Sequence, residues 1–408
     1  MKKLFFVRPM ESLYFGPPRS FSAGEAHHGH SLFPPTPFAF QGMVRSQLLR
    51  AVHDPSLDLD DWSEKAIEER ERLIGTPDRL PADWQLSGPL PALLERSEET
   101  EELLVVPWVP TPQFILGSKE LPLHARLTSS DHSSLTDMNE TYRDYLLLGR
   151  PDRHNGRPLG GWIGPQNLFF ALAGEGNGSW NMGYWNKPLP PFVKEETRPG
   201  VALDADHGRV KTGMLYSLLT LRFADQSGFF GELDGDLAVR IPQDALTTGF
   251  GTAGHKGRAV AFEPVEEMHP QWLKLLQGEH LPPEVTTEED AFFWLLTLTP
   301  VWLEDVFKPR LNVVLPQDVR VQFRGAMTGD PIALGGFQMN GQASRSNKLY
   351  IPAGSAWLFQ LRGGDLISRR RALSMLHNAH IIGSKQEEAR FGFGYTLVGM
   401  GPSRPEVN

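Results

Sequence analysis

Glycine and proline interrupt this chain throughout its length, and they limit how long any regular element can run. The 408 residues include 40 Gly and 34 Pro, together about 18% where an average protein has roughly 12%. Proline breaks helices and central strands, and both residues favour turns. A helical bundle, a coiled coil and a solenoid are therefore excluded, and we expect short elements joined by many turns and long loops.

The rest of the composition is that of a folded protein without cysteine. Hydrophobic residues make up 40% of the chain and charged residues 22%, which is enough to bury a sizeable core in two or three domains. The absence of cysteine excludes disulfides, thiol catalysis, cysteine-ligated zinc and iron–sulfur clusters. The first residues lack the apolar stretch of a signal peptide, and no run is long enough to span a membrane. We expect a cytoplasmic protein with no membrane association.

Charge is distributed unevenly along the chain. Residues 1–50 carry six Lys or Arg against two Asp or Glu, residues 51–150 carry nine against 20, and residues 301–408 carry 13 against eight. The net charge of −9 argues against a freestanding, strongly basic nucleic-acid binder. If the two basic ends fold together, however, they form one positive face, while the acidic part stays solvated or meets another protein.

Strand patterns outnumber helical ones, which predicts an α+β fold with antiparallel sheets. Lys3–Arg8 has the pattern of an apolar strand, and helices are expected at Phe38–Val52, Asp60–Ile74 and Leu366–His377. Further strands are expected at Leu86–Leu90, Leu103–Val106, Val201–Leu203, Leu215–Phe223, Leu237–Ile241, Ala259–Glu263, Ala291–Thr299, Val319–Phe323, Ala356–Leu361 and Tyr395–Val398.

Residues 107–200 are the least regular part of the sequence, with one helix expected near Pro165–Ala173. We interpret them as a large insertion of loops. Five aromatic side chains are too many for so irregular a segment to bury, and exposed aromatics of this kind mark protein interfaces. They are Trp162, Phe169, Phe170, Trp180 and Trp185.

The string Gly249-x-Gly251-x-x-Gly254 matches the dinucleotide-binding fingerprint only in its spacing. That fingerprint needs a strand directly before it and a helix directly after it, whereas a strand pattern follows here. What remains is a glycine-rich loop that carries His255, Lys256 and Arg258. Such a loop can bring backbone N–H groups and cations to phosphates, and a solvated hairpin tip explains it equally well.

No set of residues is spaced for catalysis. His27-His28-Gly29-His30 is the one histidine cluster, and it could hold a metal ion or supply a general base, but no companion acid is spaced to match. Asp365 follows Gly363-Gly364 and is best explained as the cap of the next helix. We expect neither an enzyme nor a cofactor.

Near the C-terminus, Arg390-Phe391-Gly392-Phe393-Gly394 precedes the last expected strand. Aromatic rings beside cations are the parts of a platform for single-stranded RNA. In isolation, a tight turn with phenylalanines in the core is the more economical interpretation.

This glycine-rich loop before a C-terminal strand resembles that of the RAMP superfamily of CRISPR proteins. Further blocks, in the same order over the whole chain, resemble the third subunit of the Cmr (type III-B) effector complex. They are Arg8–Phe15, Gly24–His27, Ser31–Pro37, Gly42–Ser46, Arg198–Asp204, Gly213–Tyr216, Pro352–Ser355 and Phe391–Gly394. The chain departs from the family pattern at Gly251–Arg258, where a Gly-Gly-Glu-Gly-Arg type of loop is usual.

The resemblance implies two ferredoxin-like (RRM-like) units, which we place at residues 1–240, with insertions over about 54–200, and at 241–408. It implies a non-catalytic subunit that binds the repeat-derived 5′ tag of crRNA and meets target RNA only indirectly. It also implies contacts with the large palm-domain subunit and with the backbone subunits. The alternatives are a RAMP-type endoribonuclease that processes crRNA and the equivalent subunit of a type III-A complex.

We expect the RNA-binding residues to lie on loops that a ferredoxin-like unit brings together, with cations on phosphates and glycines that let backbone approach the RNA. The candidates are Arg45, Arg198, His255, Lys256, Arg258, Lys385, Arg390, Phe391, Gly392, Phe393 and Gly394.

Overall fold

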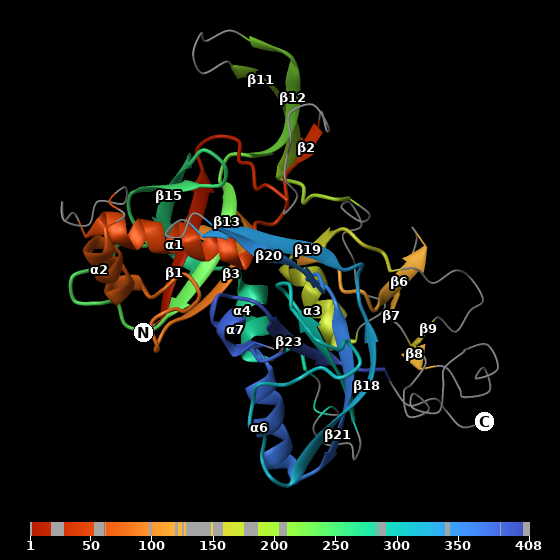
Figure 1. Ribbon diagram of the computed structural model, residues 1–408. Coiled ribbons are helices and arrows are strands. Elements are labelled where there is room, and N and C mark those ends of the chain that lie inside the picture. Colours follow the sequence, from red (N-terminus) through yellow and green to blue (C-terminus); the bar gives the residue numbers. More distant parts are fainter. Residues whose placement is uncertain are drawn as a thin grey trace.

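The computed structural model contains two large sheets and a few short helices (Figure 1), which confirms the mixed α+β class. The structure describes residues 2–17, 28–52, 61, 63–97, 100–118, 121–124, 126–127, 148–149, 158–174, 187–203, 210–281, 283, 285, 291–338, 343–383 and 385–402.

The first sheet has seven strands in the order β14-β15-β1-β13-β3-β4-β16. In that order they are Phe250–Ala253, Arg258–Pro264, Lys2–Pro9, Ser227–Asp234, Gln85–Arg96, Leu103–Pro107 and Glu267–Met268. Strand β1 lies in the middle, antiparallel to both neighbours, and Phe5, Phe6 and Val7 are fully buried because both of its faces are covered.

Helices α1 (Pro37–Ala51) and α2 (Glu64–Ile74) lie beside this sheet (Figure 1). Thr36 accepts a hydrogen bond from the Ala39 backbone N–H at 3.1 Å, and proline occupies the first position of α1. Both are local signals for the start of a helix. The ring of Phe40 stacks on Phe5 of β1 with centroids 5.9 Å apart. Helix α2 ends at Gly75, as expected, but begins four residues later than the sequence pattern predicted.

The second sheet has five strands in the order β18-β21-β17-β23-β22. In that order they are Val319–Met327, Ala356–Gly363, Phe292–Thr297, Tyr395–Met400 and Ala379–His380. Helix α6 (Leu366–Leu376) packs Ala372, Leu373 and Leu376 into the core of this sheet. Asp365 caps the helix, as predicted, by accepting a hydrogen bond from the Ser368 N–H at 2.8 Å.

A third core lies between the two sheets. Helices α3 (Pro165–Ala173) and α4 (Pro270–Gln277) contribute to it, and Phe114 stacks on Trp294 of β17 at 4.9 Å. Residues 107–200 are therefore more than a peripheral insertion, because part of them builds this core. Short pairs complete the segment: β5 (Val109–Pro110) with β10 (Trp162–Ile163), β6 (Ile115–Ser118) with β7 (Leu121–His124), and β8 (Arg126–Leu127) with β9 (Leu148–Gly149).

The prediction of exposed aromatics in this segment is wrong for Trp162. Its ring is buried against Phe33 at 5.3 Å, and its Nε1 donates to the Pro188 carbonyl at 3.1 Å. Phe169 and Phe170 are half-buried. Trp180 and Trp185 lie outside the described residues.

One predicted strand is misplaced. Leu237–Ile241 lies in a region of turns that buries Leu237 and Ile241 and exposes Val239. The strand that precedes it, β13, was not predicted. Glycines within β13 lower the strand propensity of its sequence, although Phe229 and Phe230 lie at its centre. The division of the chain at residue 240 stays a prediction. Strands β15 and β16 follow that residue and pair with β1 and β4, which precede it, while β14 pairs with β15.

Two longer groups of strands also lie outside the large sheets. Strands β11 (Val193–Leu203) and β12 (Val210–Phe223) form a long antiparallel pair that projects from the molecule at the top of Figure 1, with β2 (His28–His30) alongside β12. We call these three strands the arm. Strands β19 (Ile332–Gln338) and β20 (Ala343–Tyr350) form a second pair near the junction of the two sheets.

Candidate nucleic-acid interface

Three segments that are far apart in the sequence meet near the base of the arm. They are the loop that follows β1, the turn between β14 and β15, and β12 of the arm itself. The backbone of Leu13 exchanges two hydrogen bonds with Leu221 of β12, at 2.9 and 2.7 Å. The Tyr14 carbonyl accepts from the His255 N–H at 2.8 Å. The loop after β1 therefore holds the other two segments in place.

The turn between β14 and β15 is tight and points its polar side chains outward. Gly254, Lys256 and Gly257 all have positive φ, and a Cβ on Gly254 would lie 2.6 Å from the Tyr14 carbonyl oxygen. Glycine is needed at that position because the turn is pressed against the loop. His255 and Lys256 are exposed at its tip. Burial, followed by the charges of Lys256 and Arg258, lowers the pKa of His255.

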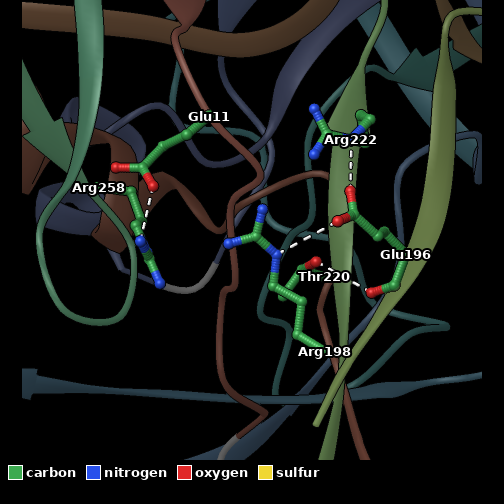
Figure 2. Close-up of polar contacts among 6 residues, drawn as sticks. All are labelled: Glu11, Glu196, Arg198, Thr220, Arg222 and Arg258. Carbon is green, nitrogen blue, oxygen red and sulfur yellow. Dashed lines mark hydrogen bonds and ion pairs between the residues drawn. The ribbon is translucent and has the colours of Figure 1, made fainter.

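Arg258 lies at the start of β15 and pairs with Glu11. Its Nη1 donates to Glu11 Oε2 at 2.6 Å, while Glu11 Oε1 accepts from the Ala259 N–H at 3.1 Å (Figure 2). That backbone hydrogen bond, and then Arg258, hold the pKa of Glu11 below its usual value. Glu11 thus fixes a half-exposed guanidinium beside the turn.

The arm contributes two more arginines on neighbouring strands. Arg198 of β11 and Arg222 of β12 both contact the carboxylate of Glu196, the former at 3.4 Å. The hydrogen bond from Arg222 is the largest cause that lowers the pKa of Glu196. Figure 2 shows the Arg198 guanidinium between Glu196 and the Arg258–Glu11 pair, and the charge of Arg198 also lowers the pKa of Glu11. The two pairs therefore form one electrostatic cluster.

We call Arg198, Arg222, Lys256 and Arg258, with Glu11 and Glu196, the basic cluster. Four cations face two carboxylates, so the cluster keeps a positive balance. A cleft of about 550 Å³ opens beside it, with Glu11 and Arg222 on its wall. Arg8 and Glu263 also line the cleft, and Arg8 Nε donates to Glu263 at 2.8 Å. Guanidinium donors and carboxylate acceptors over a concave surface can serve both phosphates and the edges of unstacked bases.

Arg45, a predicted RNA-binding residue, points into the protein. It is 9% exposed and donates to Gln41 Oε1 and to the carbonyl of Gly75. Burial lowers its pKa to about 10. The side chain ties α1 to the end of α2, so the structure gives Arg45 an internal role in place of the predicted RNA contact.

The C-terminal motif is likewise internal. Phe391 and Phe393 are each 2% exposed, and Phe38 packs against both rings. Arg390 donates to the carbonyls of Trp84 and Pro81. These side chains offer no stacking surface, which agrees with the tight turn and core phenylalanines favoured by the motif in isolation. It corrects the inclusion of Arg390, Phe391 and Phe393 among the RNA-binding candidates.

The glycines of the same motif serve close internal contacts. A Cβ on Gly394 would lie 2.1 Å from the Ile382 carbonyl oxygen, and one on Gly392 would lie 2.6 Å from that of Gly88. Glycine is thus needed for the chain's own packing, so the predicted approach to RNA is not supported at either position. Lys385, by contrast, is exposed and belongs to a separate cluster with Trp302 and Lys348.

Comparison with known protein families identifies the family of this chain. The model of the family described as CRISPR-associated protein (Cas_Cmr3) matches residues 5–401. The chain belongs to the Cmr3 family. This confirms the resemblance to the third Cmr subunit.

Chains in solved structures of Cmr complexes are similar to this Cmr3-family chain at low identity. One, in the type III-B Cmr-beta complex bound to cognate target RNA, is 15% identical with a TM-score of 0.43, over 87% of this chain and 86% of that chain. Another, in that complex with target RNA and AMPPnP, is 16% identical with a TM-score of 0.42 over the same shares. A chain of the apo complex is 13% identical with a TM-score of 0.25, over 65% of this chain and 98% of that chain. No curated protein matches.

Other features of this Cmr3-family chain concern catalysis and membranes. Within the described ranges, no three His, Asp or Glu side chains are grouped to hold a metal ion. His27 lies outside the described residues, and His30 is exposed on β2. Among the helices that the structure describes, none is long and apolar enough to cross a membrane.

Sequence reasoning missed half of the basic cluster in this Cmr3-family protein. Glu11, Glu196 and Arg222 were not predicted, although Arg198, Lys256 and Arg258 were. One signal was present: Lys194, Glu196 and Arg198, every second residue of a strand, alternate in charge. This pattern is typical of a solvated face with paired charges. The partner strand could not be identified without the register that sets Arg198 opposite Leu218.

Proposed function

We propose that this Cmr3-family chain is a non-catalytic subunit of a type III-B CRISPR effector and that its basic cluster holds the 5′ tag of crRNA. The convergence of Arg198, Lys256 and Arg258 from separate segments on one exposed surface carries the proposal. Membership of the Cmr3 family supports the assignment to type III-B over type III-A.

The pairing within the basic cluster suits phosphate binding. Glu11 occupies one N–H donor of Arg258, and Glu196 accepts from the Nε of Arg198. A guanidinium has five N–H donors, so each arginine keeps donors for a phosphate oxygen while its carboxylate holds it in position. Charge-assisted bonds of this kind fix a strand without reading its sequence. The adjoining cleft supplies both donors and acceptors, so we assign the tag's bases to it.

The strand orders support two ferredoxin-like units. In the first sheet the order β15-β1-β13-β3 places β1 between β15 and β13, and α1 joins β1 to β3. In the second sheet β23-β17-β21-β18 repeats that arrangement, and α6 joins β21 to β23. Each is the strand order of a βαββαβ unit, with one of its two helices present. We propose that the units are joined through the core between the sheets.

We further propose that the chain contacts the large palm-domain subunit and the backbone subunits, and meets target RNA only through them. Exposed apolar side chains support protein contacts away from the basic cluster. Leu366 and Ile367 at the start of α6 are 41% and 76% exposed, and Phe250 on the edge strand β14 is 70% exposed. Apolar groups of this size in water favour an interface.

The proposal is tested with purified assembly and with crRNA that bears or lacks its tag. We expect Arg198→Ala, Lys256→Ala and Arg258→Ala together to weaken retention of tagged crRNA. Each neutralised phosphate contributes about −0.7 to the slope of log K against log salt for single strands, so the slope should flatten by about 2. The control is Lys274→Ala with Lys308→Ala, because both lysines are exposed and lie outside the cluster. Equal binding of tagged and untagged RNA by parent and triple variant would contradict the proposal.

A further inference from the structure

Two lysine side chains share one tryptophan ring at the junction of the two sheets. Lys348 Nζ of β20 lies 4.4 Å from the centroid of the Trp302 ring, and Lys385 Nζ lies 5.4 Å from it. Trp302 follows β17, and Lys385 immediately precedes α7 (Gln386–Arg390). The fold therefore gathers three separate segments at this point. We call Trp302, Lys348 and Lys385 the lysine pair site.

Positive charge is in excess at the lysine pair site. The contact with Lys385 is the largest cause that lowers the pKa of Lys348. One carboxylate is near: Glu388 lies 3.9 Å from Lys385, and burial raises its pKa. Arg345 lies on the same strand as Lys348, and its guanidinium pairs with the Asp78 carboxylate at 2.6 Å. Two like charges this close favour an anion beside them.

Strand β20, which carries Lys348, also contacts the start of α1. Arg345 of β20 lies over the ring of Phe38 in the first turn of α1, 4.7 Å from its centroid. Strand β2 of the arm ends at His30, eight residues before Phe38. A chain segment of eight residues spans at most about 29 Å. The start of α1 therefore lies within about 29 Å of the end of β2 in the arm.

We propose that Lys348 and Lys385 together bind one phosphodiester of the single-stranded RNA that the basic cluster holds. The two ammonium groups would turn from the indole to the phosphate oxygens, which leaves the Trp302 face for the adjacent base. A base on tryptophan and a phosphate on lysine are the usual pairing for single strands. This inference rests on the proposed function and adds a second contact to it.

The test uses a double variant of the site, Lys348→Gln and Lys385→Gln. The control is a double variant of two exposed lysines elsewhere, Lys274→Gln and Lys308→Gln. Binding of labelled, tagged crRNA to the full chain is measured between about 50 and 200 mM salt, with a thermal melt of each variant. We expect the paired variant to flatten the salt slope by about 0.7, the value for one phosphate, and the control to leave it unchanged. Acylation of lysines in the parent, with and without RNA, gives a second measurement. RNA should protect Lys348 and Lys385 but not Lys308.

The outcomes separate this inference from the proposed function. If the basic-cluster triple variant loses RNA while the lysine variant matches its control, and RNA protects neither lysine, the lysine pair site binds no RNA and this inference alone fails. If the parent binds no tagged RNA, both fail. If the lysine variant keeps its RNA affinity but loses a partner subunit on purification, the site binds an acidic protein segment and the inference is overturned. Should the variant not fold, acylation of the parent decides.

Discussion

The two glycine-rich loops of this protein have similar backbones and opposite roles. Gly254 in the turn between β14 and β15 and Gly394 before β23 both have φ of +64°, and each presses against a carbonyl oxygen of another segment. The first loop exposes His255 and Lys256, whereas the second buries Phe391 and Phe393. Glycine in such a loop therefore indicates a close approach to another segment of backbone. The neighbouring side chains determine whether the loop faces water or the hydrophobic core.

The largest expected effect comes from removing a ring of the buried loop. Phe393→Ala should lower the free energy of unfolding by about 3–5 kcal/mol, because it opens a cavity beside Phe38 and Tyr350. The matched control is Phe250→Ala, a 70% exposed ring on β14, which should change the free energy by less than about 0.5 kcal/mol. Denaturant unfolding measures both. Equal effects would show that the two loops do not differ as described.

A pH titration gives the next largest effect. His380 lies under the buried loop, where its Nδ1 donates to the Phe393 carbonyl at 3.0 Å and its Nε2 accepts from Ser87 Oγ at 2.8 Å. Burial lowers its pKa to about 4. The folded state therefore favours the neutral ring, and its stabilisation is present above pH 6.5 and is lost as the pH falls toward 4. The full loss is about 3 kcal/mol, of which about 2 falls between pH 7 and 5.

Other buried histidines have depressed pKa values too, so His380 must be isolated. His380→Gln should reduce the dependence of unfolding free energy on pH between 7 and 5, relative to the parent. His255→Gln, in the exposed loop, should change that dependence less, because His255 is exposed to water in the folded state. A parent curve that is flat over this range would contradict the assignment of a neutral His380.

A smaller effect distinguishes the arginines of the two loops. Arg390→Ala removes the side-chain donor to the Trp84 carbonyl and one of the donors to the Pro81 carbonyl, which also accepts from the Trp84 N–H. This loss should cost about 1–3 kcal/mol of unfolding free energy and leave RNA affinity unchanged. Arg258→Ala breaks a half-exposed pair with Glu11, which should cost at most about 1 kcal/mol and weaken RNA binding. Calorimetry and RNA titration of both variants give the comparison. If Arg390→Ala weakened RNA binding and Arg258→Ala lowered only the stability, the loop before β23 and not the turn between β14 and β15 would bind the RNA.

Much of the fold was predictable from local sequence. Helix α3 was predicted at its observed bounds, since Pro165 at its start and Gly174 at its end are strong local signals. Helix α1 also begins with a proline, and α6 begins after its cap, Asp365. Strand β13 was not found, because its pairing with β1 and β3 overrides the low propensity of its glycines.

The candidate site was predictable only in part. Cations in a glycine loop identified Lys256 and Arg258, and nothing in the sequence could show that Arg45 and Arg390 point inward, because their partners are backbone carbonyls of other segments. The same limit applies to Glu11 and Arg222. Their roles depend on which loops meet, and that is fixed by the pairing of Leu13 with Leu221.

The smallest effect is expected at the histidine cluster His27-His28-Gly29-His30. It tests whether this segment binds RNA or cleaves it. His27→Ala, His28→Ala and His30→Ala together should leave target cleavage by the assembled complex within about threefold of the parent. Catalytic acids and bases typically contribute 10²–10⁴-fold, so a catalytic role would be visible. The basic-cluster triple variant serves as the control that lowers RNA retention. A loss of about a hundredfold in cleavage, with assembly and RNA retention intact, would favour the endoribonuclease alternative over a binding subunit.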